Sequence, residues 1–274
     1  MADLDPYVLG YTQTERERLE RQANELAHES ASLFDAIGVR AGWRAVEIGC
    51  GPRGCLALLA ERVGANGQVV GVERNAEEVA SAQKFAADAK LANVQVVQAD
   101  GRDTGLPAAS FDLATARLVL VNVPKPEQIV AEMVRLVRPG GIVALHEPDS
   151  TTQRFDPPLQ AMARVQQLLG ASAERSGVDR TIALRAPRLL RELGLVDVRV
   201  NPLVHVYPSG HSRRSMPLWF AENARPRLLE QGLVTEAEID LLIASLRRYL
   251  DDPNTLVVSS LFLQVWGRVP GIRA

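Results

Sequence analysis

The chain has 274 residues, of which 46% are hydrophobic and 23% are charged, so it is long and apolar enough to bury one large core. Its 31 basic and 33 acidic residues give a formal charge of −2, and no basic run could neutralise a row of phosphates, which argues against a nucleic-acid partner. No apolar run approaches the ~20 residues of a membrane span, and the N-terminus lacks a signal-peptide core, so we expect a cytoplasmic protein that does not contact a membrane.

The first elements in chain order predict an α/β protein. Residues 14–34 repeat apolar side chains at steps of three and four, which indicates a leading helix. Short β-branched runs then alternate with amphipathic stretches. Strands are expected at RAVEIG, QVVGVE, VQVVQA, FDLATARL and IVALHEP, with helices starting at Cys55, Asn75 and Pro126. Continuous apolar strands separated by helices are typical of a parallel sheet that is covered on both faces.

After Pro148 the alternation is interrupted by further helical segments. One is expected over 158–176, and two more over 216–252, where WFAENARPRLLEQGL and TEAEIDLLIASLRRYL are amphipathic. The regular pattern resumes between and after them with ALRAPRLLRELGL, VDVRVNPLVHVY and LVVSSLFLQVWGRV. Because ligands in open α/β sheets bind at the carboxyl ends of the strands, the inserted helices are placed where they can roof such a site.

The stretch VEIGCGPRG carries a G-x-G-x-x-G spacing between a strand and a helix, which also fits a dinucleotide site. Two features argue against a pyrophosphate. The carboxylate of Glu47 would repel phosphate, and Pro52 removes a backbone N–H from the turn that would bind it. A ligand with positive charge and no phosphate fits better, and S-adenosylmethionine carries an ammonium and a sulfonium.

Two further carboxylates end the next two strands. Glu73 stands where a carboxylate binds ribose hydroxyls, a role that both kinds of ligand would require. Asp100, in QADG, stands where a carboxylate can accept a hydrogen bond from an adenine amine, and this residue separates the two ligands. With Glu47 and the glycines, these acids occupy consecutive strand ends.

From about Trp43 to Asp149 these motifs resemble those of the class I S-adenosylmethionine-dependent methyltransferases. The matching segments are VEIGCGPRG, VGVER, QADG, FDLATARLVLVNV and LVRPGGIVALHEPD. The lead-in YVLGYTQTERERLERQ resembles bacterial small-molecule methyltransferases, many of them from secondary-metabolite pathways, and the scarcity of lysine among the basic residues also suggests a bacterial genome.

The resemblance implies a Rossmann-like α/β fold with a seven-stranded, mostly parallel sheet and an antiparallel last strand. VDVRVNPLVHVY and LFLQVWGRV would form its closing hairpin. It also implies an N-terminal helical cap over the cofactor at residues 1–34. The methyltransferase domain would then span 35–274, with helical insertions at about 150–180 and 209–254.

S-adenosyl-L-methionine is the implied cofactor, and S-adenosyl-L-homocysteine the product. Eleven residues are predicted to bind it: Tyr11, Glu47, Gly49, Cys50, Gly51, Glu73, Arg74, Asp100, Gly101, Arg117 and Leu118. Two of them have structural alternatives. The ring of Tyr11 could pack as a hydrophobic staple at a helix start, and Arg117 of the fourth strand could form a surface ion pair.

A small, cyclic or aromatic metabolite is the expected acceptor, methylated at carbon, nitrogen or oxygen. The chain lacks the Asn-Pro-Pro-aromatic tetrad of relatives that methylate base or glutamine nitrogens, and it lacks clustered carboxylates for magnesium, so we predict no metal. Glu147 is the first candidate for a general base and His146 the second, with His211 as a fallback. The alternative is structural: His146 packs against a helix and Glu147 bonds to backbone.

Three functional classes are left open. The favoured one is a methyltransferase. The others are a different cofactor-dependent enzyme on the same scaffold, such as an oxidoreductase, and a non-catalytic cofactor-binding subunit. The partner expected is a small molecule, with a homodimer as the candidate assembly. The two cysteines, Cys50 and Cys55, have no histidine nearby and indicate reduced thiols.

Overall fold

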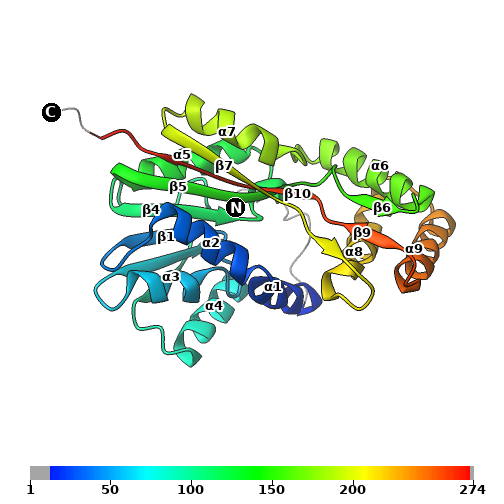
Figure 1. The fold of residues 1–274 in the computed structure, drawn as a ribbon, viewed down its shortest axis with the longest axis horizontal. Coiled ribbons are helices and arrows are strands. Elements are labelled where there is room, and N and C mark those ends of the chain that lie inside the picture. The colour runs from blue at the N-terminus through cyan, green and yellow to red at the C-terminus, as the bar shows by residue number, and fades with distance from the viewer. Residues whose placement is uncertain (1–12, 272–274) are drawn as a thin grey trace.

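A computed structural model describes residues 13–271 and contains a seven-stranded sheet in the order β3-β2-β1-β4-β5-β10-β7 (Figure 1). Its strands are β1 (Arg44–Ile48), β2 (Gln68–Glu73), β3 (Val94–Gln98), β4 (Phe111–Arg117), β5 (Val137–Asp149), β7 (Val196–Leu203) and β10 (Leu261–Arg268). The first five pair in parallel, and β10 lies antiparallel between β5 and β7. The predicted mostly parallel sheet with an antiparallel last strand is confirmed, as is the closing hairpin.

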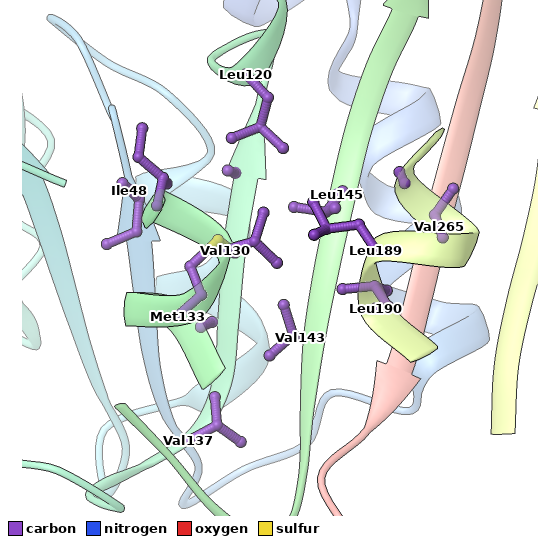
Figure 2. Packing of buried hydrophobic residues seen from close by; sticks show 14 of the residues in the cluster. Ile48, Leu120, Val130, Met133, Val137, Val143, Leu145, Leu189, Leu190 and Val265 are labelled. Carbon is purple, nitrogen blue, oxygen red and sulfur yellow. The ribbon is translucent and has the colours of Figure 1, made fainter. Parts of the chain in front are cut away.

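Helices cover both faces of this sheet, each on its own apolar cluster. On one face lie α2 (Ala27–Ile37), α3 (Leu56–Val63) and α4 (Ala76–Asp88), and on the other α5 (Pro126–Leu136) and α7 (Ile182–Glu192). Figure 2 shows the second cluster, in which Val130 and Met133 of α5 and Leu189 and Leu190 of α7 pack on β4 and β5. Burial on both faces explains why the central strands are continuously apolar.

The leading helix predicted over 14–34 is two helices that break at Leu26. The second, α2, buries Leu33 and Phe34 against α3, whereas α1 (Gln13–Glu25) crosses toward the glycine loop, where the cavity described below is lined by Leu19. The two halves thus bury their apolar sides against different neighbours. Periodicity alone does not report such a change of direction.

The predicted insertions form what we call the inserted lobe, made of α6 (Gln160–Arg175), α8 (Met216–Glu230), α9 (Glu236–Asp251) and a three-stranded sheet. Its helices share an apolar core that includes Leu168, Leu228 and Ile239. The small sheet, β6 (Arg154–Asp156), β9 (Leu256–Val258) and β8 (Val206–Tyr207), was not predicted, because strands of two or three residues carry too little periodicity. The lobe lies beyond the ends of the main strands (Figure 1).

Two short 3₁₀ helices complete the connections near the strand ends, η1 (Leu120–Asn122) and η2 (Ser212–Ser215). Within residues 13–271, no helix combines the length and apolar character that a membrane span requires. Over the same range, no three His, Cys, Asp or Glu side chains gather in a way that could hold a metal ion.

Candidate active site

A cavity of about 290 Å³ lies between the carboxyl ends of the parallel strands and the inserted lobe. Loops after β1, β2, β3 and β4 form one half of its wall, and α1 adds Arg18, Leu19 and Gln22. Residues of the inserted lobe and its neighbours form the other half. We call these the strand half and the lobe half. Ten of the eleven predicted cofactor residues line the strand half; Tyr11 lies outside the described residues.

The glycine loop owes its shape to two close approaches. A side chain at Gly54, where φ is +48°, would bring its Cβ to 2.6 Å from Oε2 of Glu47. At Gly49, where φ is +68°, a Cβ would lie 2.6 Å from Cγ2 of Val119. Glycine is therefore required at both positions, by backbone conformation and by lack of space. A Cβ at Gly51 would instead meet only Leu19 of α1, at 3.9 Å.

Glu47 is buried at the start of α3. Both of its carboxylate oxygens accept hydrogen bonds from the backbone N–H of Cys55, at 2.9 and 2.8 Å, which caps the helix with a negative charge. Burial raises the pKa of Glu47 to about 7, against the opposing effect of the Arg117 guanidinium. Arg117 itself donates to Oγ of Ser30 at 2.9 Å and to the carbonyl of Gly54 at 3.3 Å. It is thus an internal part of the cavity wall and not a surface ion pair.

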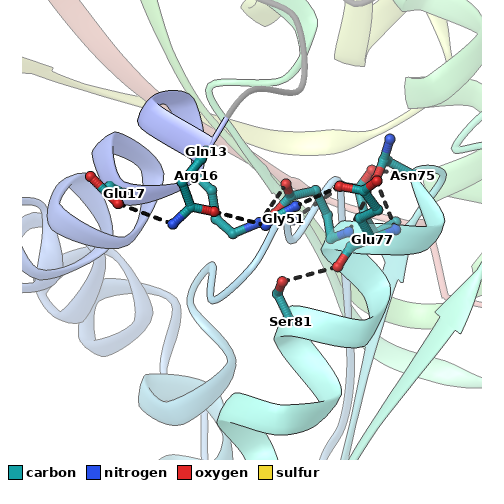
Figure 3. Close-up of polar contacts among 9 residues, drawn as sticks. Gln13, Arg16, Glu17, Gly51, Asn75, Glu77 and Ser81 are labelled. Carbon is teal, nitrogen blue, oxygen red and sulfur yellow. Dashed lines mark hydrogen bonds and ion pairs between the residues drawn. The ribbon is translucent and has the colours of Figure 1, made fainter.

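Glu73, at the end of β2, accepts hydrogen bonds from three backbone N–H groups. Its Oε2 accepts from the N–H of Gly51 at 3.1 Å, and its Oε1 accepts from those of Arg74 and Asn75 at 2.8 and 2.9 Å. Nearby, Arg16 of α1 donates to Glu77 and Glu78 of α4 at 3.0 Å each, which fixes α1 across this side of the cavity (Figure 3). The carboxylate that sequence reasoning placed near a ribose therefore faces the same cavity as the glycine loop.

Asp100, after β3, is held by a neighbour that sequence reasoning missed. Arg102 donates to both carboxylate oxygens, from Nε at 3.0 Å and from Nη2 at 2.8 Å. These hydrogen bonds lower the pKa of Asp100, although burial opposes them. Arg102 lines the cavity as well. Its place two residues beyond a strand-end acid is the signal that could have identified it.

A family model described as a methyltransferase domain matches residues 46–145. The nocamycin O-methyltransferase of Saccharothrix syringae is 36% identical over 116 residues, covering 42% of this chain and 41% of that protein. An aklanonic acid methyltransferase of Streptomyces sp. (strain C5) is 28% identical over 144 residues, covering 47% of this chain and 66% of that protein. This chain spans less than two thirds of the length of either relative.

The fold agrees with that match. The structure of Haemonchus contortus phosphoethanolamine N-methyltransferase 2 in complex with S-adenosyl-L-methionine aligns with a TM-score of 0.56 at 16% identity, covering 89% of this chain and 52% of that chain. Residues 46–145 of this chain thus match the methyltransferase-domain family, and the surrounding fold is that of the solved methyltransferase. S-adenosyl-L-methionine is the cofactor of the family.

The strand half of the cavity offers hydrogen-bond acceptors to a cationic cofactor. All four carboxylates of the cavity lining lie there: Glu47, Glu73, Glu78 and Asp100. Oε2 of Glu78 is buried and has no hydrogen-bond partner among the described residues, so the wall holds an acceptor that a bound ligand can satisfy. Pro52 also lines the cavity and offers no N–H. A ligand with ammonium and hydroxyl groups would find acceptors at this wall, beside the arginines that line the same half.

The two candidate bases, Glu147 and His146, do not belong to the described lining of the cavity. Oε1 of Glu147 accepts from the N–H groups of Val119 and Leu120 at 2.9 Å each, and Oε2 from that of Val121 at 3.3 Å. Burial raises the pKa of Glu147 to about 7, and the three N–H groups oppose the rise. Of the two roles left open for Glu147, the observed bonds are those of the structural one. Its catalytic role stays a prediction.

His146 is 1% exposed, and its ring meets that of Phe262 on β10 edge-on, with 5.8 Å between the ring centroids. Neither Nδ1 nor Nε2 has a hydrogen-bond partner among the described residues. Burial, with the charges of Arg117 and Arg213, lowers the pKa of His146 to about 3. At neutral pH the imidazole is therefore uncharged. A catalytic role for it also stays a prediction.

Sequence reasoning missed most of the lobe half of the cavity. Lining residues from scattered segments meet there: Met162, Gln166, Arg180, Tyr207, Arg213, Met216, Arg227 and Phe262. Of two adjacent aromatics on α8, Phe220 lines the cavity, whereas the ring of Trp219 lies 4.5 Å from the guanidinium carbon of Arg18. His211 is exposed, and its Nδ1 accepts from the N–H of Arg213, which caps η2. No local motif marks this set, because its members come from segments far apart in the sequence.

Proposed function

We propose that this chain transfers a methyl group from S-adenosyl-L-methionine to carbon, nitrogen or oxygen of a small cyclic or aromatic metabolite. The observation that carries the proposal is the two-sided cavity. Its strand half holds Glu47, Glu73 and Asp100 at consecutive strand ends, and its lobe half offers apolar and aromatic walls to a second molecule. The names of the two relatives, both methyltransferases of small molecules, support the same activity.

Within this proposal the strand half holds the cofactor. Glu73 binds the ribose hydroxyls, and Glu47 and Arg117 face the methionine end. Asp100 accepts from the adenine amine, since a carboxylate has about four lone-pair sites and Arg102 leaves some of them free. Gly49 and Gly51 leave the backbone bare for close approach, and Cys50, Arg74, Gly101 and Leu118 complete the lining. Tyr11 stays a proposed contact.

When bound, S-adenosyl-L-methionine supplies a methyl group that is already activated for in-line displacement. The protein's part is to align the acceptor and exclude water. Met162, Met216, Phe220 and Phe262 provide a largely apolar wall for that purpose. Glu147 contributes by holding the backbone of residues 119–121, two of which line the cavity.

Two measurements test the proposal. Calorimetric titration of the full chain should show binding of S-adenosyl-L-methionine and S-adenosyl-L-homocysteine, and no binding of NAD or NADP at the same concentrations. Incubation with a library of cyclic metabolites should then yield S-adenosyl-L-homocysteine with at least one of them. Binding of NAD in place of the sulfonium ligand would identify an oxidoreductase. Binding of the cofactor without turnover on any acceptor would favour a non-catalytic subunit.

We also propose a cytoplasmic location, a bacterial secondary-metabolite pathway and a homodimer. Cys50 and Cys55 are both free and buried, which is compatible with a reducing compartment. Light scattering after size exclusion decides the assembly state.

A further inference from the structure

Two neighbouring arginines of η2 are both buried but are used very differently. Arg214, 4% exposed, is saturated by oxygens of the surrounding chain. Its partners are the carbonyls of Leu250, Tyr207, Thr255 and Asp252 and the hydroxyl of Thr255. Arg213, 8% exposed, has no hydrogen-bond partner for Nε or for Nη1 among the described residues. Arg214 therefore joins several segments of the lobe, whereas Nε and Nη1 of Arg213 donate to no described residue.

Arg213 lines the lobe half of the cavity. Its guanidinium carbon lies 5.9 Å from the ring centroids of both Tyr207 and Phe262, so two aromatic rings flank the charge. The nearest carboxylate recorded for it is Glu25, with Oε2 at 3.9 Å from Nη1, beyond hydrogen-bonding distance. The backbone N–H of Arg213 is fixed by Nδ1 of His211. The side chain thus starts from a fixed position and presents unused donors.

Arginines line both halves of the cavity, but the lining carboxylates are confined to one half. The four lining carboxylates all belong to the strand half. The lobe half is lined by Arg180, Arg213 and Arg227 and, among the described residues, by no carboxylate. Arg180 donates to the carbonyls of Gln166 and Ser150, and Arg227 donates to Oγ of Ser172. These two are bonded within the protein, but their positive charges still act on whatever occupies the lobe half.

We propose that the acceptor is a cyclic carboxylic acid and that Arg213 binds its carboxylate while Tyr207 and Phe262 contact its ring. The inference rests on the proposed function, because it names the class of the second substrate. A buried guanidinium whose Nε and Nη1 have no hydrogen-bond acceptor is costly, and a bound carboxylate supplies acceptor oxygens nearer than Glu25, which forms an ion pair with Arg213 at 3.9 Å. An amine or other cationic acceptor would face three arginines and, among the described lining residues, no carboxylate in the same half of the cavity.

A matched pair of ligands tests this without knowledge of the natural acceptor. The full chain, saturated with S-adenosyl-L-homocysteine, is titrated calorimetrically with 2-naphthoate and with 2-naphthamide, which share ring and shape but differ in charge. We expect the acid to bind at least about tenfold more tightly than the amide, as one charge-assisted hydrogen bond would provide. In Arg213→Met the preference should disappear. The exposed Arg248 lies on α9 of the same lobe, and Arg248→Met should keep the preference, because it removes the same charge away from the cavity.

The outcomes separate the inference from the proposed function. If S-adenosyl-L-homocysteine itself does not bind, the proposed function fails. If it binds but the acid shows no preference over the amide, including the case in which neither binds at millimolar concentration, the assignment of Arg213 is wrong. A preference that survives in Arg213→Met overturns it too. Should Arg213→Met fail to fold, the acid-to-amide ratio of the wild type still decides, and Arg213→Gln provides the second variant.

Discussion

At the scale of single residues, three strand-end carboxylates bind backbone N–H groups in the same way but differ in their position relative to the cavity. Glu47, Glu73 and Glu147 all accept hydrogen bonds from backbone N–H groups. Glu47 and Glu73 also line the cavity, whereas Glu147 does not belong to its described lining. A carboxylate held by backbone donors is fixed in place, and its position relative to the cavity then decides whether it can meet a ligand.

Glu73→Ala tests the first of these positions. We expect the dissociation constant of S-adenosyl-L-homocysteine to rise at least tenfold, because charge-assisted hydrogen bonds are worth about 1.5 to 3 kcal/mol each. Glu61→Ala, on the exposed side of α3, is the control and should leave the affinity unchanged. Both are measured by calorimetry on protein whose circular dichroism matches the wild type. An affinity of Glu73→Ala within threefold of the wild type would show that the ribose is held elsewhere.

His146 predicts a pH dependence of stability. Its pKa is lowered in the folded chain to about 3, from an ordinary value near 6.5, so the unfolded chain binds the proton first as pH falls. Stability from this group is complete above pH 6.5 and is lost toward pH 3, by up to about 1.4 kcal/mol per pH unit. Urea unfolding between pH 6.5 and 4.5 should therefore show a steeper loss in the wild type than in His146→Leu. His28→Gln, at an exposed position, should follow the wild type, and parallel curves for all three proteins would contradict the lowered pKa.

At the scale of elements, β5 is joined to the segment after β4 through one side chain. The three bonds from residues 119–121 to Glu147 fix the start of η1, and Val119 in turn closes over Gly49. This connection lets one buried acid shape the glycine loop without touching it.

Glu147→Gln separates a structural role from a catalytic one. At pH 8, above the pKa of about 7, the wild-type carboxylate is ionised, and the amide would turn its NH₂ toward a backbone N–H. We expect the free energy of unfolding to fall by about 1 to 3 kcal/mol, since a buried donor is left unsatisfied. Glu127→Gln, on the exposed start of α5, should change it by no more than about 0.5 kcal/mol. Unchanged stability together with a loss of 10² to 10⁴ in the rate of S-adenosyl-L-homocysteine formation, typical of a lost general base, would instead make Glu147 the base.

At the scale of the whole molecule, the main sheet with its two apolar clusters and the inserted lobe with its own core share one cavity. The strand half rests on the main sheet, and the lobe half rests on the separate core of the inserted lobe.

Ile239→Ala removes a fully buried side chain from the core of the inserted lobe and should lower the free energy of unfolding by about 2 to 5 kcal/mol. Leu241→Ala, 73% exposed on the same helix, should cost little. If cofactor binding by the strand half does not depend on the lobe core, the affinity for S-adenosyl-L-homocysteine stays within threefold of the wild type in both variants. A tenfold loss of affinity in Ile239→Ala would show that the lobe also shapes the strand half.

The sequence by itself determined the fold class and the strand half of the site. Strand and helix periodicity, the glycine spacing and acids such as Glu47, Glu73 and Asp100 are all local signals. Parallel strands place their carboxyl ends at one edge of the sheet, so local order along the chain translates directly into proximity. The main strands lie where they were expected, and the residues predicted for the cofactor, apart from Tyr11, line one cavity.

Only the tertiary structure decided the use of Glu147 and the make-up of the lobe half. On a strand covered on both faces, alternation cannot tell which side chain reaches a cavity and which meets neighbouring backbone. Arg180, Arg213 and Phe262 come from separate elements and meet only because the inserted lobe folds back over the strand ends. Whether a buried arginine is saturated, like Arg214, or left with free donors, like Arg213, depends on carbonyls brought from distant parts of the chain. No pattern in the sequence records that difference.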